Sequence, residues 1–425
     1  MTRKWVALPA AAALLVTGCA APDPEGRAKA AKAQSDVITV GMLRPSTGSS
    51  AASGLDMERG WRLFWELNGD RVAGKRIRTV FEDDASNPSV GLNKARRLIT
   101  SDQVDLMTGP LLANVGLAVA DLVDRREVPM VLPVVSADDL TQRKRLKHVV
   151  RLAGWTSSQT THVLGDYAYD QGHRTAVTIC NDYAFGYESC GGFTNTFTDR
   201  GGKVIGKLWN PLPTPDFSTY MAQIRQADPE VVFAEEVGVD SVRFVKAWKE
   251  FGMDSTGIKL LANETVVDQA FLRSSKEAAL GIVSAGHFAE GRPARATRSF
   301  VDAYHRRYGL YPSYYAAATY TAAQGVREAV AAVNGEVTDT ARFLAALRAV
   351  KLADSAFGPE HLDPYGAPVF NTYIREVRPG PYGPWNVPIK TYPRVSQFWK
   401  YDPAEFLRHP VYGKNYQGDG PWPRP

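Results

Sequence analysis

Residues 37–48 read VITVGMLRPSTG, an apolar and β-branched run that leads into a short polar loop. The run Val37–Leu43 predicts a strand, because Val, Ile and Thr favour extended backbone. Four large apolar residues then recur at helical spacing: Met57, Trp61, Phe64 and Trp65. This stripe predicts a helix with one buried face, and Ile77–Phe81 predicts the next strand. A strand, a helix and a strand in this order are typical of a parallel α/β unit.

The same alternation continues through the middle of the chain. The runs predicted as strands are 104–108, 128–133, 175–180, 230–234 and 258–262. The stretches predicted as helices are 88–99, 115–125, 186–200, 217–226 and 239–251. Such alternation indicates parallel sheets with helices on both faces. Because 425 residues are too many for one hydrophobic core, we predict two such sheets.

The C-terminal part has a different character. Long helical patterns cover 293–308, 316–334 and 338–350, and a convincing strand covers 369–377. From Leu352 onward the chain is rich in Pro, Gly and aromatic residues. We expect the tail from Tyr412 to pack loosely over the surface or to be disordered.

The first 19 residues, MTRKWVALPAAAALLVTGC, indicate export. Arg3 and Lys4 precede an apolar run that is too short to span a bilayer, as in secretory signals. Thr17 and Gly18 before Cys19 are similar to a bacterial lipobox, the motif at which the cysteine is acylated. We therefore predict a signal peptide over 1–18 and a lipid anchor on Cys19, with 19–36 as the lipidated N-terminus and flexible tether. The alternative is an ordinary signal peptide in which Cys19 has no special role.

Composition and motifs exclude several classes of function. The net charge is +5, but the basic residues are scattered among acids, so we expect no nucleic-acid partner. None of the seven histidines forms a close ligand pair, so we expect no metal site, and we expect no cofactor. The segment 69–76, GDRVAGKR, nearly matches a phosphate-binding loop, but Arg76 replaces the hydroxyl residue and the segment follows a helix. No GxSxG motif of a serine hydrolase is present.

One pair of cysteines and two pairs of acidic residues are candidates for a disulfide or a functional site. Cys180 and Cys190, ten apart in an exported protein, are either a disulfide or two free thiols. For Asp83-Asp84 we favour a strand end that faces a loop. Glu235-Glu236 follows a predicted buried strand at the carboxyl edge of a sheet, where ligands bind in open α/β folds. A ligand role and a structural role are both open for this pair.

Several segments, taken in order, resemble a known family. They are VGMLRPSTG at 40–48, Gly109-Pro110, Val131-Leu132-Pro133 before Ser136, and NDYAFG at 181–186. This order is similar to that of the periplasmic binding proteins of the leucine/isoleucine/valine type, the substrate receptors of ABC importers. The later segments DYAFGYE, NTYIREV, TYPRVSQFW and YDPAEF are most similar to the branch associated with aromatic acids.

The resemblance implies an α/β fold of two doubly wound parallel-sheet lobes, joined by three crossover segments, with a ligand cleft between them. Lobe 1 would comprise 37–154 and 284–355, lobe 2 would comprise 155–283 and 356–402, and 403–425 would form a tail.

It also implies a function without catalysis. The chain would be a monomeric, extracytoplasmic lipoprotein, held at the cell membrane by its lipid anchor. It would deliver a branched-chain or other amino acid, or an aromatic acid, to an ABC permease and ATPase complex. The alternatives are a ligand sensor without a transport role and an extracellular hydrolase using Glu235, Glu236 or Glu264.

The resemblance further implies nine ligand-binding residues: Ser53, Leu112, Ala113, Asn114, Val134, Ser136, Phe185, Glu236 and Glu264. Ala113 stands where amino-acid receptors use a serine for the ligand carboxylate, so only its N–H could serve. Ser136 matches a threonine, Phe185 matches an aromatic wall, and Glu264 matches the acid that binds an ammonium group. Val237 stands near the place of an expected tyrosine. The alternatives are that Phe185 packs inside its own lobe and that Glu264 caps a helix.

Overall fold

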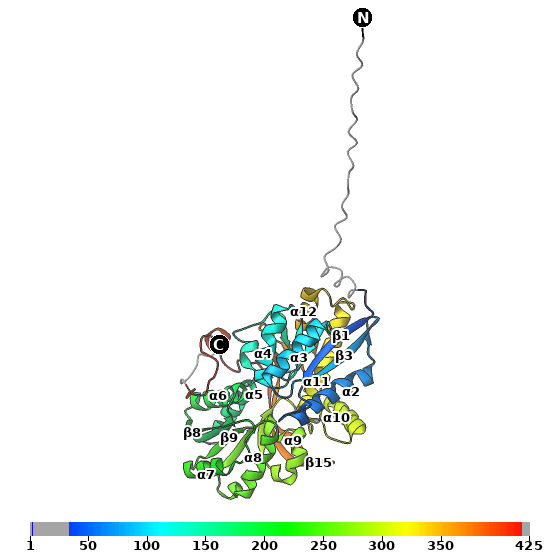
Figure 1. The fold of residues 1–425 in the computed structure, drawn as a ribbon. Coiled ribbons are helices and arrows are strands. Elements are labelled where there is room, and N and C mark those ends of the chain that lie inside the picture. Colours follow the sequence, from blue (N-terminus) through cyan, green and yellow to red (C-terminus); the bar gives the residue numbers. More distant parts are fainter. Residues whose placement is uncertain (1, 3–33, 419–425) are drawn as a thin grey trace. The chain divides into compact units, whose positions relative to one another are not determined.

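Two sheets with their helices make up the fold in a computed structural model that describes residue 2 and residues 34–418 (Figure 1). The first sheet has six strands in the order β2-β3-β1-β4-β5-β6 among these residues. Its strands are β1 (Val37–Arg44), β2 (Arg71–Val72), β3 (Lys75–Asp83), β4 (Leu106–Thr108), β5 (Met130–Leu132) and β6 (Val149–Arg151). All its pairings are parallel except that of β2 with β3.

Helices from two separate parts of the chain share the core of this first sheet. They are α2 (Ala51–Asn68), α3 (Pro88–Thr100), α4 (Ala113–Arg125), α10 (Arg295–Tyr308), α11 (Tyr314–Ala332) and α12 (Thr340–Arg348). The predicted stripe of α2 is buried and forms part of that core. Gly60 lets α2 approach α11 closely, because a Cβ there would lie 2.0 Å from the Ala316 carbonyl oxygen.

The second sheet, nine-stranded within the described residues, is mixed. Its strands are β7 (Thr175–Asn181), β8 (Lys203–Asn210), β9 (Val231–Glu235), β10 (Lys259–Asn263), β11 (Val283–Gly286), β12 (Lys351–Leu352), β13 (Glu360–Leu362), β14 (Pro368–Gly380) and β15 (Gly383–Val395). The strands from β7 to β11 pair in parallel, whereas β14 pairs antiparallel with β11, β13 and β15. The remaining α-helices are α5 (Gln159–Asp170), α6 (Ala184–Asp199), α7 (Ser218–Ala227), α8 (Val239–Glu250), α9 (Gln269–Ser275) and α13 (Pro403–Phe406).

The chain passes between the two sheets three times in the described residues. It leaves the first sheet after β6, returns to its core with α10 to α12 after β11, and leaves again to form β12 to β15. We call the elements around the six-stranded sheet lobe 1 and those around the mixed sheet lobe 2. The predicted α/β fold with two sheet-centred lobes is confirmed, and the antiparallel part of lobe 2 corrects the expectation of purely parallel sheets.

Several described elements escaped prediction, including β6 and β11, and for three others the physical reason is plain. The edge strand β8 reads KVIGKLWN and is partly exposed along most of its length, so its pattern is weak. Helix α5 is buried on nearly all sides, which removes the polar face that a periodicity search needs. Strand β15 carries several polar and proline residues because it pairs at the end of the sheet.

The expectation of a loose or disordered tail from Tyr412 is wrong for Tyr412 itself, whereas most of the described residues 413–418 are exposed. Tyr412 is buried, and its hydroxyl lies 2.9 Å from His162 Nε2 and accepts a hydrogen bond of 2.8 Å from Asn195 Nδ2. Gly191 leaves space for the ring, because a Cβ there would lie 2.4 Å from the Tyr412 Cγ. A large aromatic side chain with a satisfied hydroxyl favours burial over exposure.

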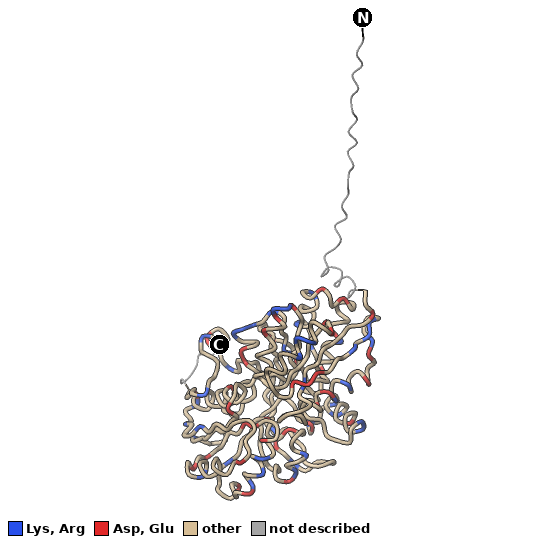
Figure 2. Tube along the Cα trace, viewed as in Figure 1, with Lys and Arg blue, Asp and Glu red and all other residues tan. Residues whose placement is uncertain are grey.

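The predicted signal peptide and Cys19 lie outside the described residues. Within the described part, no helix combines the length and apolar character that crossing a bilayer requires. Lysine, arginine and acidic residues are interspersed over both lobes (Figure 2).

Candidate functional site

A very small cavity of about 10 Å³ lies where strand ends of the two lobes meet. Five of the predicted ligand residues line it together: Leu112, Ala113, Val134, Ser136 and Phe185. The other lining residues are Leu111, Tyr183, Val237, Thr265, Tyr314 and Tyr315. Most of these residues follow the carboxyl ends of β4, β5, β7, β9 and β10, and the last two begin α11. This is the edge at which open α/β sheets bind ligands.

One end of the cavity is the N-terminus of α4. Leu112 is the N-cap residue, and it makes no side-chain hydrogen bond to the first turn. Asn114 does not line the cavity, and its Oδ1 accepts from the Val115 N–H at 2.9 Å. Since Leu112 supplies no side-chain cap, the backbone N–H groups at this helix end, together with the helix dipole, favour an anion such as a carboxylate.

Ser136 stands at the front of a buried hydrogen-bond chain. Its Oγ lies 3.1 Å from Ser157 Oγ, which donates to Glu188 Oε2 at 2.6 Å. The same Glu188 oxygen accepts from the Asp138 N–H at 3.1 Å. Burial raises the pKa of Glu188 well above its usual value, and the neighbouring Asp138 raises it further. This series of hydrogen bonds therefore fixes the position of the Ser136 hydroxyl.

Aromatic rings from both lobes form the walls. Phe185, in the first turn of α6, packs edge-on against Trp155, with ring centroids 5.7 Å apart. Trp155 also meets Tyr314 edge-on at 6.1 Å, and Tyr183 lies 6.1 Å from Phe185. Phe185 is only 4% exposed. It therefore lines the cavity and is packed inside the protein, in the core cluster of lobe 1 and not in that of its own lobe.

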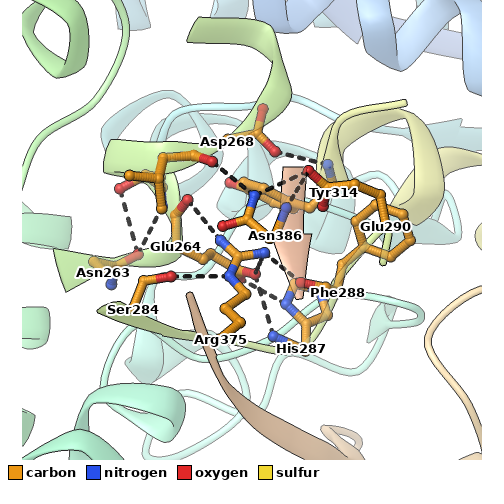
Figure 3. A network of polar contacts seen from close by, with 12 residues as sticks. Asn263, Glu264, Asp268, Ser284, His287, Phe288, Glu290, Tyr314, Arg375 and Asn386 are labelled. Atoms are coloured by element: carbon orange, nitrogen blue, oxygen red, sulfur yellow. Dashed lines mark hydrogen bonds and ion pairs between the residues drawn. The ribbon is translucent and has the colours of Figure 1, made fainter. Parts of the chain in front are cut away.

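Glu264 faces away from the cavity into a buried polar network (Figure 3). Its Oε1 lies 2.6 Å from His287 Nδ1, and its Oε2 accepts from the His287 N–H at 3.2 Å. Arg375 donates to the Glu264 carbonyl oxygen at 2.9 Å, and its guanidinium lies 3.9 Å from Oε2. Ser284 Oγ accepts from Arg375 Nε at 3.0 Å. Both carboxylate oxygens therefore have partners inside the protein.

Glu236 and Ser53, the remaining predicted ligand residues, do not line the cavity either. Glu236 is fully buried, and its Oε2 accepts from Asn181 Nδ2 at 2.8 Å and from Asn210 Nδ2 at 2.9 Å. Ser53 lies on α2, with its hydroxyl beside that of Tyr315.

The paired acids at the end of β9 are buried and hydrogen-bonded. Burial raises the pKa of Glu235 to about 8, whereas the hydrogen bond from the Asn181 N–H to its Oε2, 3.1 Å long, acts in the opposite direction. Burial and the neighbouring Glu235 raise the pKa of Glu236 well above its usual value. The residues that line the cavity include no Asp or Glu. The site therefore presents aromatic surface, hydroxyls and backbone N–H groups.

A disulfide joins Cys180, in β7, to Cys190, in α6. It encloses the loop and first turn that carry Tyr183 and Phe185, and thereby ties this wall of the cavity to the sheet. No group of three or more His, Cys, Asp or Glu side chains in the described part is placed to hold a metal ion.

Sequence reasoning missed the tyrosines and Thr265. Tyr183 and Thr265 follow strand ends, so their positions after β7 and β10 were a usable signal. Tyr314 and Tyr315 gave no local signal, because the fold brings the start of α11 to the cavity from far along the chain.

Comparisons with known proteins agree with this arrangement. The sequence profile of the family named periplasmic binding protein matches residues 37–381. The Leu/Ile/Val-binding protein homolog 6 of Brucella melitensis biotype 1 is 27% identical over 369 residues, which span 85% of this chain and 93% of that protein.

Two solved structures are also similar. A solute binding protein of an ABC transporter from Rhodopseudomonas palustris BisB5, in complex with 3,4-dihydroxybenzoic acid, is 30% identical with a TM-score of 0.81, covering 85% of this chain and 99% of that one. An R. palustris solute binding protein in complex with benzoate is 26% identical with a TM-score of 0.79, covering 85% and 97%. With its fold, its interlobe cavity and a profile match over most of its length, the chain belongs to the periplasmic binding protein family.

Proposed function

We propose that this solute-binding protein takes up a small aromatic carboxylate outside the cytoplasm and delivers it to an ABC importer. The observation that carries the ligand class is the engagement of Glu264 by His287 and Arg375. An α-amino acid needs an acceptor for its ammonium group, and none of the lining residues carries a carboxylate. An aromatic acid needs only an anion site and apolar walls.

The two ends of the cavity suit the two ends of such a ligand. The N–H groups at the start of α4 would receive the carboxylate. The ring would lie against Phe185, Tyr183 and Tyr314, where aromatic pairing adds about 0.5–1.5 kcal/mol beyond burial.

The R. palustris relatives, crystallised with dihydroxybenzoic acid and benzoate, support this ligand class. The name of the Brucella relative supports the second candidate, a branched-chain amino acid.

The size of the cavity supports a hinged binding cycle. Its volume of about 10 Å³ is far below the range of about 300–1,000 Å³ that is usual for ligand pockets, so a ligand could enter only if the lobes moved apart. We propose that the lobes, with the boundaries 37–154 plus 284–355 and 155–283 plus 356–402, separate to admit the ligand and then close over it.

The cellular setting belongs to the same proposal. Acylation of Cys19 would hold the protein, as a monomer, at the outer face of the cell membrane beside its permease. The family is a family of binding proteins, and we propose that the chain does not catalyse a reaction. Loss of lipid labelling in Cys19→Ser is the expected result for the anchor, and unchanged labelling would refute it.

Thermal unfolding with candidate solutes tests the ligand class. Benzoate and 4-hydroxybenzoate, at 100 times their dissociation constants, should each stabilise the protein by about 2.7 kcal/mol, whereas leucine should not. Stabilisation by leucine and not by the aromatic acids would replace the proposal with the amino-acid candidate. Conversion of a bound compound into a product would contradict a binding role.

A further inference from the structure

Asp268 lies between the N-termini of two helices that belong to different lobes (Figure 3). It follows η3 (Glu264–Val267), and its Oδ1 accepts from the Ala270 N–H at 2.9 Å, which caps α9. Its Oδ2 accepts from the N–H of Tyr314, the first residue of α11, at 2.8 Å. One fully buried carboxyl group therefore serves two helix ends.

Helix α11 packs in the core of lobe 1, whereas η3 and α9 contact both cores, since Ala270 and Phe271 of α9 lie in the core of lobe 1. In η3 and α9, Val266, Val267 and Leu272 are buried against the mixed sheet of lobe 2. The hydrogen bond between Asp268 and Tyr314 therefore crosses from one lobe to the other.

A second contact from α9 crosses in the same direction. Arg273 Nη2 donates to Asp56 Oδ2, on α2, at 2.8 Å and to the Tyr311 carbonyl oxygen at 2.9 Å. Asp56 is fully buried, and its other oxygen accepts from the Tyr304 hydroxyl at 2.9 Å. Since Asp56 and Tyr304 belong to lobe 1, Arg273 joins a polar cluster that is already built there.

These contacts bear on the cavity through α11. Tyr314 and Tyr315, its first two residues, line the cavity, whereas Asp268 and Arg273 do not. We infer that Asp268 and Arg273 are positioning residues that hold the first turn of α11 against lobe 2 and so set ligand affinity without touching the ligand. Because the apparent dissociation constant rises as the binding-competent form becomes rarer, loss of either contact should weaken binding. The choice of benzoate as a probe rests on the proposed function.

The test compares three variants of the full chain. Asp268→Asn keeps the size of the side chain but turns an amide NH₂ toward one of the two N–H donors. Arg273→Met keeps the alkyl stem and removes both hydrogen bonds. The matched control is Asp339→Asn, since Asp339 caps α12 of lobe 1 by accepting from the Arg342 N–H at 3.1 Å and has no role at the cavity.

Calorimetry and stopped-flow fluorescence with benzoate would measure the effect. Asp268→Asn and Arg273→Met should each raise the dissociation constant about tenfold, mostly through faster release, while Asp339→Asn stays within about twofold. A merely structural cap would lower the melting temperature in all three variants and leave the dissociation rate unchanged. Wild-type affinity in Asp268→Asn would overturn the inference.

A second readout separates this inference from the proposed function. If the wild type binds no aromatic acid, the proposed ligand class fails, and hydrogen exchange of the Tyr314 amide decides the inference. Faster exchange in both Asp268→Asn and Arg273→Met, but not in Asp339→Asn, would support it. Equal protection in the wild type and Asp268→Asn would refute it.

Discussion

Replacing Glu264 by glutamine separates a ligand-binding acid from a structural one. The substitution keeps the shape of the side chain and removes its charge. In the structure the carboxylate contacts His287 and Arg375 and does not line the cavity. We therefore expect Glu264→Gln to lower the free energy of unfolding and to leave benzoate affinity within about threefold, less than 1 kcal/mol.

The expected loss of stability follows from the two contacts. A hydrogen bond to a charged group contributes about 1.5–3 kcal/mol and a neutral one about 0.5–1.5, so the His287 contact loses about 1–2 kcal/mol. Arg375, which is 1% exposed, also loses its nearby negative charge. Removing one partner of a buried ion pair costs roughly 3–5 kcal/mol, and glutamine retains part of this contact. The total is about 2–4 kcal/mol.

Urea unfolding followed by tryptophan fluorescence would give the free energy, and calorimetry would give the affinity. Glu277→Gln is the control, because Glu277 is an exposed acid in the same lobe. A loss of affinity of about 100-fold in Glu264→Gln, with unchanged stability, would refute the reasoning and would indicate that Glu264 binds the ligand.

Phe185→Ala should cost about 3–5 kcal/mol of stability and also weaken benzoate binding, because the buried ring supports Trp155 while lining the cavity; retained affinity in calorimetry would contradict this. Joint replacement of Cys180 and Cys190 by serine should lower stability by about 2–3 kcal/mol, and thiol alkylation of the native, non-reduced protein would disprove the bridge. Native Glu235 holds its proton up to about pH 8, against an ordinary pKa of 4.5, so the free energy of unfolding should fall as pH rises between these values. Glu235→Gln should reduce the dependence of the free energy of unfolding on pH, measured by urea unfolding. An unchanged dependence would contradict a raised pKa of Glu235.

Local pattern was enough to predict the order of the principal elements. The stripe on α2, the strand runs of β1 and β7 and the helix of α8 depend on the spacing of apolar residues within each segment. Burial of a helix face or strand produces that spacing, so it is visible without the rest of the fold. Where burial is complete, as in α5, the spacing disappears and so did the prediction.

The composition of the cavity was only partly predictable. The resemblance to the family indicated Ser136 and Phe185, and the rule that ligands bind at the carboxyl edge of parallel strands also favoured Phe185; both residues line the cavity. The same rule failed for Glu264, which also follows a strand end, because it does not say which way a side chain turns.

By itself, then, the sequence determined an α/β protein of two sheets and the family to which it belongs. Only the tertiary structure decided which side chains share the cavity and which face away. His287, after the end of β11, and Arg375, in β14, both reach Glu264, and Tyr314 lines the same cavity as Phe185 from the other lobe. Such contacts depend on how distant segments pack, so the spacing of residues within one segment does not predict them.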